Sequence, residues 1–275
     1  MALPRPPNEV RHTFFVGPRK TGTTSLHQAL EGSKLQSPAN VKETFFFERP
    51  GCGLEEYERR FAVDPERPFL ECSPSYFTSE TAVENLSRLF PGARVVITLR
   101  DPVTRVLSAI QHSRRIGLLD ERLTLDELIR NKHVLNAVDG SKYTLHTSRW
   151  SAAFPGRVAR IRQEAGGTHS EVSLEQLGRF LGVPVPASSM RARRANAARS
   201  ARSPALVRAA RGGLRVLRRA GAHGMIRRLK FLERVLYTRA HVGPFDEALR
   251  GWLAEETSEY AEMSEFEVVG EAAAE

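Results

Sequence analysis

Short apolar runs alternate with amphipathic stretches along the first two thirds of the chain. Three of these runs are typical of buried strands bounded by turn signals: His12–Gly17, Phe69–Cys72 and Arg94–Leu99. Apolar residues at helical spacing predict helices at Thr23–Leu30, Ser79–Phe90, Pro102–Ile116, Thr124–Asn131, Tyr143–Phe154 and Ser173–Leu181. Such an alternation of strands and helices indicates an α/β fold with a parallel sheet flanked by helices.

Charged residues dominate two later segments. Arg157–Glu164 carries so much charge that we expect a helix there rather than a strand. Residues 206–217 and 225–236 place apolar residues on one helical face and arginines on the other, which predicts two amphipathic helices. We expect a single domain over residues 1–275, with a core at about 12–185 and an Arg-rich, helical C-terminal part at about 186–275.

The composition excludes several classes of protein. Hydrophobic residues make up 41% and charged residues 27% of the 275, as in a globular protein rather than a disordered chain. No apolar run reaches the 18 residues of a membrane span, and because residues 1–11 hold no apolar stretch we expect no secretory signal. Two cysteines allow one disulfide at most, which favours a cytoplasmic location.

The net charge of +9 is concentrated late in the chain. Residues 191–240 hold fifteen basic residues and one acid, whereas residues 241–275 hold one Arg and ten acids. Few aromatic residues interleave the basic ones, so the segment offers no platform for stacked bases and we expect no nucleic-acid binding. Solvated helix faces, a rim beside an acidic substrate and a peripheral contact with a membrane surface stay open as roles for this segment.

A glycine-rich loop joins the first predicted strand to the first predicted helix. It runs from Gly17 to Ser25, where backbone N–H groups at a helix N-terminus favour an anion such as phosphate. Gly17 and Gly22 have the spacing of an ATP-binding P-loop, but Thr23 stands where that motif has lysine. Asp101, which follows a strand as a magnesium-binding aspartate would, keeps a P-loop kinase or NTPase as an alternative.

Five short motifs follow one another in a fixed order: Arg19-Lys-Thr-Gly-Thr-Thr-Ser-Leu26, Lys42-Glu-Thr-Phe-Phe-Phe47, Glu71-Cys-Ser-Pro-Ser-Tyr76, Arg100-Asp-Pro-Val-Thr-Arg-Val-Leu-Ser108 and Leu177-Gly-Arg-Phe-Leu-Gly-Val-Pro184. With these motifs, residues 12–185 resemble the sulfotransferases that use 3′-phosphoadenosine 5′-phosphosulfate (PAPS). The resemblance is closest to the heparan-sulfate and related carbohydrate sulfotransferases. It implies a P-loop-like parallel sheet, PAPS as the co-substrate with PAP as its product, and no metal.

The resemblance also implies roles for individual residues. The 5′-phosphosulfate would lie on Arg19, Lys20, Thr21, Gly22, Thr23, Thr24 and Ser25. The 3′-phosphate would lie on Arg100 and Ser108, and Arg193 and Arg194 would belong to a late loop over the nucleotide. Lys20 would stabilise the leaving phosphate, and Glu43 would be the general base, with His112 as the fallback base.

One motif departs from the family pattern. Cys72 stands where the family has a lysine, so the role of that lysine is lost or is supplied elsewhere, and Lys42 is the candidate substitute. The Arg or Lys side chains at positions 19, 20, 42 and 100 suit a phosphate-rich donor, since charge-assisted hydrogen bonds are strong. We expect transfer of a sulfuryl group to a hydroxyl or amine of a small-molecule, glycan or glycolipid acceptor. A non-catalytic basic binding module stays the third alternative, and the sequence predicts no oligomeric state.

Overall fold

A computed structural model describes residues 12–30, 33–39, 41–61, 68–120, 122–164, 167–186, 199–201, 237–239, 246–256, 260 and 263–270. The chain divides into two compact units. Unit 1 comprises Met1–Asp101, Gly140–Arg193 and Glu259–Glu275, and unit 2 comprises Pro102–Asp139 and Arg194–Ser258. Each unit buries a hydrophobic core of its own.

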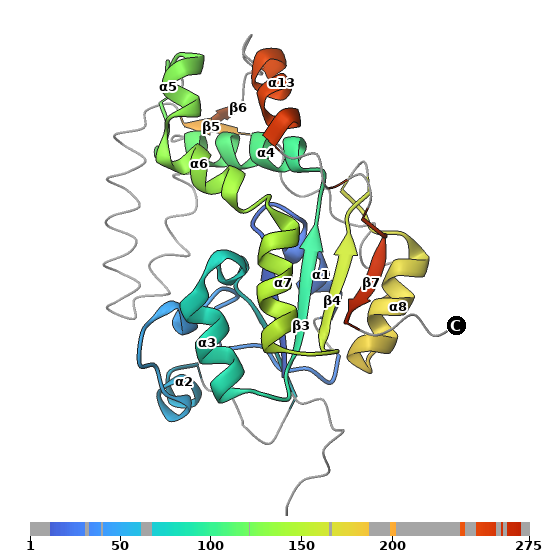
Figure 1. The fold of residues 1–275 in the computed structure, drawn as a ribbon. Helices are drawn as coiled ribbons and strands as arrows, with labels where there is room; N and C mark the ends of the chain where they lie inside the picture. Colours follow the sequence, from blue (N-terminus) through green and yellow to red (C-terminus); the bar gives the residue numbers. More distant parts are fainter. Residues whose placement is uncertain are drawn as a thin grey trace, which may run out of the picture. The chain divides into compact units, whose positions relative to one another are not determined.

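Unit 1 is built on a five-stranded sheet in the order β2-β1-β3-β4-β7, of which β3, β4 and β7 are labelled side by side in Figure 1. Its strands are β1 (His12–Gly17), β2 (Phe69–Cys72), β3 (Arg94–Leu99), β4 (Val158–Arg162) and β7 (Phe266–Val269). The first four strands are parallel, and β7 pairs antiparallel with β4 at the edge. The predicted parallel α/β sheet is therefore confirmed, with an antiparallel edge strand that we did not predict.

Both faces of this sheet are buried by helices. The helical elements of unit 1 are α1 (Thr23–Leu30), η1 (Phe46–Glu48), α2 (Leu54–Phe61), η2 (Pro74–Thr78), α3 (Glu80–Leu89), α7 (Tyr143–Ala153) and α8 (Glu171–Leu181). Phe14 and Val16 of β1 join a core with residues of α3 and α7, while Phe15 joins a second core with residues of α1 and α8. Since side chains alternate along a strand, burial of both sets explains why β1 is almost continuously apolar.

Unit 2 is mainly helical among its described residues. Its elements are α4 (Pro102–Arg115), α5 (Leu125–Ile129), α6 (Lys132–Asp139), β5 (Arg199–Ala201), β6 (Tyr237–Arg239) and α13 (Asp246–Glu256). β5 and β6 form a two-stranded antiparallel sheet. Its core contains Val106, Ile110, Val134 and Leu253, which come from α4, α6 and α13.

Two expectations about the secondary structure of unit 1 were wrong. Arg157–Glu164 contains the strand β4 rather than a helix, because Val158, Ala159 and Ile161 are buried in the sheet while the arginines between them find partners such as Glu267. The helix α8 begins before Ser173, since Ser170 accepts the capping hydrogen bond from the Ser173 N–H group.

The C-terminal part of the chain is not wholly helical. It includes α13, as expected, but it also supplies the strands β5, β6 and β7. The predicted amphipathic helices at 206–217 and 225–236 lie outside the described residues. Among the helices that the structure describes, none is long and apolar enough to cross a membrane.

A fully buried carboxylate, Glu71 of β2, connects the sheet to the segments around it. Its two oxygens accept hydrogen bonds from four hydroxyl groups: Thr44 at 2.6 Å, Tyr57 at 2.5 Å, Ser73 at 2.7 Å and Tyr76 at 2.7 Å. Burial raises the pKa of Glu71, and the four hydrogen bonds act in the opposite direction. The donors come from α2, from η2 and from the segment before η1, so one carboxylate joins three parts of unit 1.

The end of β1 depends on a glycine. Gly17 has φ +110°, and a Cβ atom there would lie 2.3 Å from the carbonyl oxygen of Pro74 in η2. We expect Gly17→Ala to lower the free energy of unfolding by about 3 kcal/mol or more, because the new methyl group meets backbone atoms as well as an unfavourable φ.

Gly156→Ala is the matched control for this substitution. Gly156 also has a positive φ, +64°, but a Cβ there would meet nothing within 4 Å. Its cost should be about 1 kcal/mol. Equal costs for the two variants in urea denaturation would show that the contact with Pro74 does not constrain Gly17.

Two substitutions at Glu71 test the buried carboxylate. Glu71→Ala removes the acceptor of three buried hydroxyls and of the partly buried Thr44 hydroxyl, and should cost about 3–5 kcal/mol of stability. Glu71→Gln keeps an oxygen for Thr44, Ser73 and Tyr76 and turns its amide toward the Tyr57 hydroxyl, which can accept. We expect it to cost less than about 1 kcal/mol at pH 7.

The pH dependence gives a second measurement at Glu71. The pKa of Glu71 lies above its ordinary value of 4.5 in the folded protein, so the folded state holds this proton more tightly than the unfolded chain. The contribution of Glu71 to the stability of the unmodified protein should therefore fall as pH rises from 4.5 through the folded pKa. Glu71→Gln has no such proton, so its stability relative to the unmodified protein should improve over this interval. A difference independent of pH would contradict the raised pKa.

Candidate active site

The loop between β1 and α1 has an unusual backbone. Gly17, Lys20 and Gly22 all have positive φ, at +110°, +73° and +86°. A Cβ on Gly22 would lie 2.4 Å from the side-chain amide nitrogen of Gln163, so any other residue would displace this side chain and would also be strained by the positive φ. The loop ends at Thr23, where α1 begins, and the first N–H groups of α1 can bind an anion at this point.

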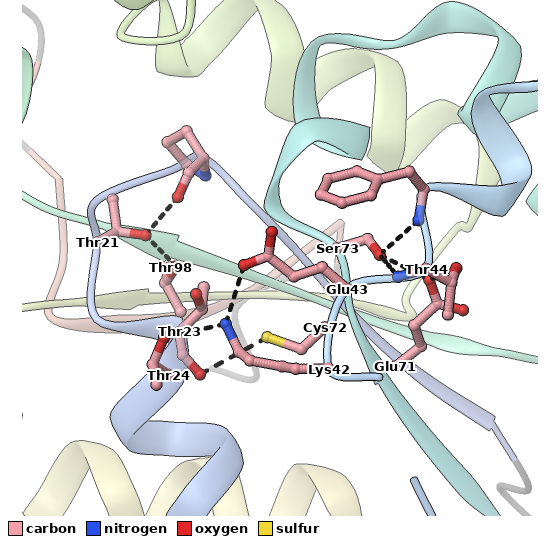
Figure 2. Close-up of polar contacts among 12 residues, drawn as sticks. Thr21, Thr23, Thr24, Lys42, Glu43, Thr44, Glu71, Cys72, Ser73 and Thr98 are labelled. Atoms are coloured by element: carbon pink, nitrogen blue, oxygen red, sulfur yellow. Dashed lines mark hydrogen bonds and ion pairs between the residues drawn. The ribbon is translucent and has the colours of Figure 1, made fainter. Parts of the chain in front are cut away.

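Thr21 holds this loop against the sheet. Its hydroxyl is fully buried, donates to the carbonyl oxygen of Pro18 and pairs with the hydroxyl of Thr98 on β3 (Figure 2). This hydroxyl is therefore engaged inside the protein, whereas Arg19 and Thr24 are exposed. Thr23 is buried, and Lys20 and Ser25 are partly exposed.

Arg100 follows β3 directly and contacts the loop. Its guanidinium Nη1 donates to the carbonyl oxygen of Lys20 at 3.3 Å. Tyr143 of α7 donates to the carbonyl oxygen of Arg100 at 2.7 Å, which fixes the backbone at the end of the strand. Burial lowers the pKa of the Arg100 guanidinium. Because β1 and β3 are parallel neighbours, their carboxyl ends bring the loop and Arg100 to one edge of the sheet.

Lys42 and Glu43 also lie at this edge. The Lys42 ammonium donates to the hydroxyl of Thr24 at 3.0 Å and to Oε1 of Glu43 at 3.3 Å (Figure 2). The two side chains remain 24% and 36% exposed, so each is open to solvent and to a ligand. The structure thus places the predicted base and the predicted substitute lysine together, at the first turn of α1.

Cys72 lies near the Lys42–Glu43 pair, and its thiol has low reactivity. Its thiol is buried and contacts the carbonyl oxygen of Thr23 at 3.6 Å. Burial raises the pKa of the thiol to about 11, and the nearby charge of Lys42 acts in the opposite direction. A thiol with this pKa is almost wholly protonated at neutral pH and is a poor nucleophile.

Ser73 and Thr44 connect the Glu71 carboxylate to the Lys42–Glu43 pair. The N–H of Thr44, the residue after Glu43, donates to the Ser73 hydroxyl at 3.0 Å, and Ser73 donates in turn to Glu71. The Thr44 hydroxyl also donates to Glu71. The backbone that carries the predicted base is therefore held by hydrogen bonds on its C-terminal side (Figure 2).

Two predicted residues belong to the other unit. Ser108 and His112 lie on α4 of unit 2, where Nδ1 of His112 is 2.8 Å from a guanidinium nitrogen of Arg115. Arg193 and Arg194 lie outside the described residues. The roles of all four remain predictions.

Several supporting residues could not be found by motif. Thr98 lies in an apolar strand and Tyr57 in a charged helix, and neither position carries a sequence signal for a contact. Glu71 opens the motif that ends at Tyr76, but nothing in the sequence indicates which hydroxyl groups donate hydrogen bonds to it. Gln163 and His169 also lie beside Gly22, and burial lowers the pKa of His169 to about 4. That imidazole is therefore neutral at physiological pH.

Comparisons with known proteins agree with the motifs. Residues 52–187 match the model of the sulfotransferase family. Human bifunctional heparan sulfate N-deacetylase/N-sulfotransferase 3 is 37% identical over 191 residues, which cover 62% of this chain and 22% of that protein. Human heparan sulfate glucosamine 3-O-sulfotransferase 5 is 31% identical over 159 residues, covering 52% of this chain and 44% of that protein. The chain spans less than half the length of these relatives.

A solved structure supports the fold. The sulfotransferase from Alicyclobacillus acidocaldarius superposes with a TM-score of 0.51 and 23% identity, over 64% of this chain and 82% of that one. The predicted P-loop-like α/β fold agrees with this neighbour. The family match over residues 52–187, the sequence relatives and the five motifs in their order all make this chain similar to proteins of the sulfotransferase family.

Proposed function

We propose that this protein transfers the sulfuryl group of PAPS to a hydroxyl or amine of a carbohydrate or small-molecule acceptor. The observation that carries the proposal is the hydrogen bond from Lys42 to Thr24, which holds Lys42 and Glu43 at the first turn of α1. An acceptor at Glu43 would there meet a phosphosulfate on the loop. The family match and the heparan sulfate relatives support the same reaction.

The residues at this edge fit a nucleotide that carries several phosphate oxygens. The loop offers the N–H groups of α1, the exposed guanidinium of Arg19 and the ammonium of Lys20. Arg100 adds a planar guanidinium that can bind an anion through two N–H groups. Its contact with the Lys20 carbonyl holds it against the loop before any ligand arrives.

The proposed reaction needs one proton acceptor and several positive charges. Glu43 takes the proton from the acceptor as its oxygen or nitrogen attacks sulfur. The bond from sulfur to the phosphate oxygen breaks, and PAP leaves with the bonding electrons. Lys20 stabilises the charge that grows on this leaving oxygen. Lys42, beside Glu43 and close to position 72, supplies the positive charge that the family lysine would carry there.

We also propose a cytoplasmic location. Both cysteines, Cys52 and Cys72, are buried as free thiols. Free thiols fit a reducing compartment.

No group of metal-ligating side chains is formed among the described residues, and the reaction above requires no metal.

Nucleotide binding distinguishes this proposal from the kinase alternative. PAP at about 100 times its Kd should raise the Tm by about 5 °C in the absence of Mg²⁺, from the mass-action stabilisation of the folded state. Lys20→Ala and Arg100→Ala should each remove most of this shift, because both side chains would contact phosphate. Lys34→Ala, at an exposed lysine outside the loop, is the matched control and should keep the shift. Stabilisation by ATP with Mg²⁺ and none by PAP would favour a kinase.

Glu43→Gln separates binding from chemistry. The amide has nearly the same shape but cannot accept a proton, so we expect an unchanged PAP-dependent Tm shift and a fall in kcat of about 10²- to 10⁴-fold. Glu55→Gln, at an exposed carboxylate of α2, should leave kcat unchanged. If Glu43→Gln keeps full turnover with labelled PAPS, Glu43 is not the base, and His112 becomes the residue to substitute.

A further inference from the structure

The run Phe45-Phe46-Phe47 is not buried as a whole. Phe46 and Phe47 are buried, with 2% and 0% exposed. Phe45 is 38% exposed. Of the exposed large hydrophobic side chains among the described residues, it is the one aromatic.

The backbone of Phe45 is in a conformation that bulky residues rarely adopt. Its φ is +53° and its ψ is +19°, in the left-handed region. The neighbouring hydrogen bonds hold it there: the N–H groups of Thr44 and Phe45 share the Ser73 hydroxyl, and the N–H of Phe46 donates to the Thr44 hydroxyl. A glycine or asparagine would adopt this conformation more easily, so phenylalanine at this position carries backbone strain.

The ring lies between the two halves of the proposed site. Phe45 follows Glu43 by two residues, and the guanidinium carbon of Arg19, from the phosphate loop, is 5.5 Å from the ring centroid. Arg19 thus covers one face of the ring. The ring thus keeps an exposed part, two residues after Glu43 in the chain and in contact with Arg19 of the loop.

The surroundings decide what kind of ligand this ring suits. The side chains at the site are charged, namely Arg19, Lys42 and Glu43. No other exposed large hydrophobic of the described residues belongs to this segment or to the loop, so the ring is not part of an apolar patch. A flat apolar acceptor would require enclosing apolar walls. A pyranose ring needs one aromatic surface for its polarised C–H groups and charged partners for its hydroxyls.

We propose that Phe45 is a stacking platform for a sugar ring of the acceptor, which presents its reacting hydroxyl or amine to Glu43. This inference rests on the proposed sulfotransferase function and adds the substrate class and a specificity residue. Phe45 orients the sugar, and the ring takes no part in proton transfer. The contact with Arg19 keeps the ring in place while the donor occupies the loop.

Phe45→Gly separates a ligand-binding role from a structural one. Glycine relieves the positive φ and removes the ring, so the Tm of the variant should be equal to or above that of the unmodified protein. Its PAP-dependent Tm shift should be unchanged. Saturation-transfer NMR with methyl β-glucopyranoside and methyl β-glucosaminide, each at millimolar concentration over the PAP-saturated protein, should show sugar contact that falls about fivefold or more in Phe45→Gly.

Two further variants sharpen the comparison. Phe45→Trp should keep or strengthen the sugar signal, because it retains an aromatic surface. Leu145→Ala, at a 53% exposed residue of α7, removes a similar exposed apolar side chain from the same unit and should leave the signal unchanged. p-Nitrophenol serves as the competing aromatic acceptor in the same measurement.

The outcomes are distinct. A Tm loss in Phe45→Gly like that of a core substitution would make Phe45 structural and overturn the proposal. A smaller PAP-dependent Tm shift in Phe45→Gly with an unchanged sugar signal would show that the ring supports Arg19 and donor binding. This result would also overturn the proposal. A Phe45-dependent signal from p-nitrophenol but not from either sugar would refute the sugar assignment. An unmodified protein that PAP does not stabilise would instead refute the proposed function, and this inference with it.

Discussion

The acceptance of four hydroxyl hydrogen bonds by Glu71 is the interaction on which the site depends. A buried carboxylate without a charged partner is costly, and here O–H groups from separate segments offset that cost. Since the same network continues through the Ser73 hydroxyl, it fixes the backbone at Thr44 and Phe45, directly after Glu43. The position of the proposed base is therefore set from within the core, although the base itself is exposed to solvent.

The regular elements of unit 1 could be predicted wherever apolar pattern and turn signals agreed. β1, β2, β3 and α1 match the sequence boundaries because their residues are buried on both faces or along one clear stripe. β4 was mistaken for a helix because alternate arginines interrupt its pattern, and each finds a partner that local sequence does not reveal, such as Glu267 of β7. Pairing between distant segments overrides local composition in such a strand.

The site was predictable in its charges and less so in its supports. The loop and Arg100 meet because the parallel strands β1 and β3 end at one edge of the sheet, and the Lys42–Glu43 pair is held there by the hydrogen bond from Lys42 to Thr24. The role of Thr21 as a brace depends on Thr98, which lies 77 positions later in the chain. Equally, no pattern marks Phe45 as the exposed member of its aromatic run. Phe45 is exposed and Phe46 is buried because of backbone hydrogen bonds that form only in the folded protein.

The antiparallel pairing of β7 with β4 bears on the order in which the protein is assembled. β4 ends at Arg162, and its partner begins at Phe266, so roughly a hundred residues leave the ribosome between the two. During that interval the edge of a largely apolar parallel sheet would present unpaired N–H and C=O groups to other nascent chains. Strand β7 therefore completes the pairing of β4 only late in synthesis, and the Arg160–Glu267 ion pair adds a side-chain contact between the two strands.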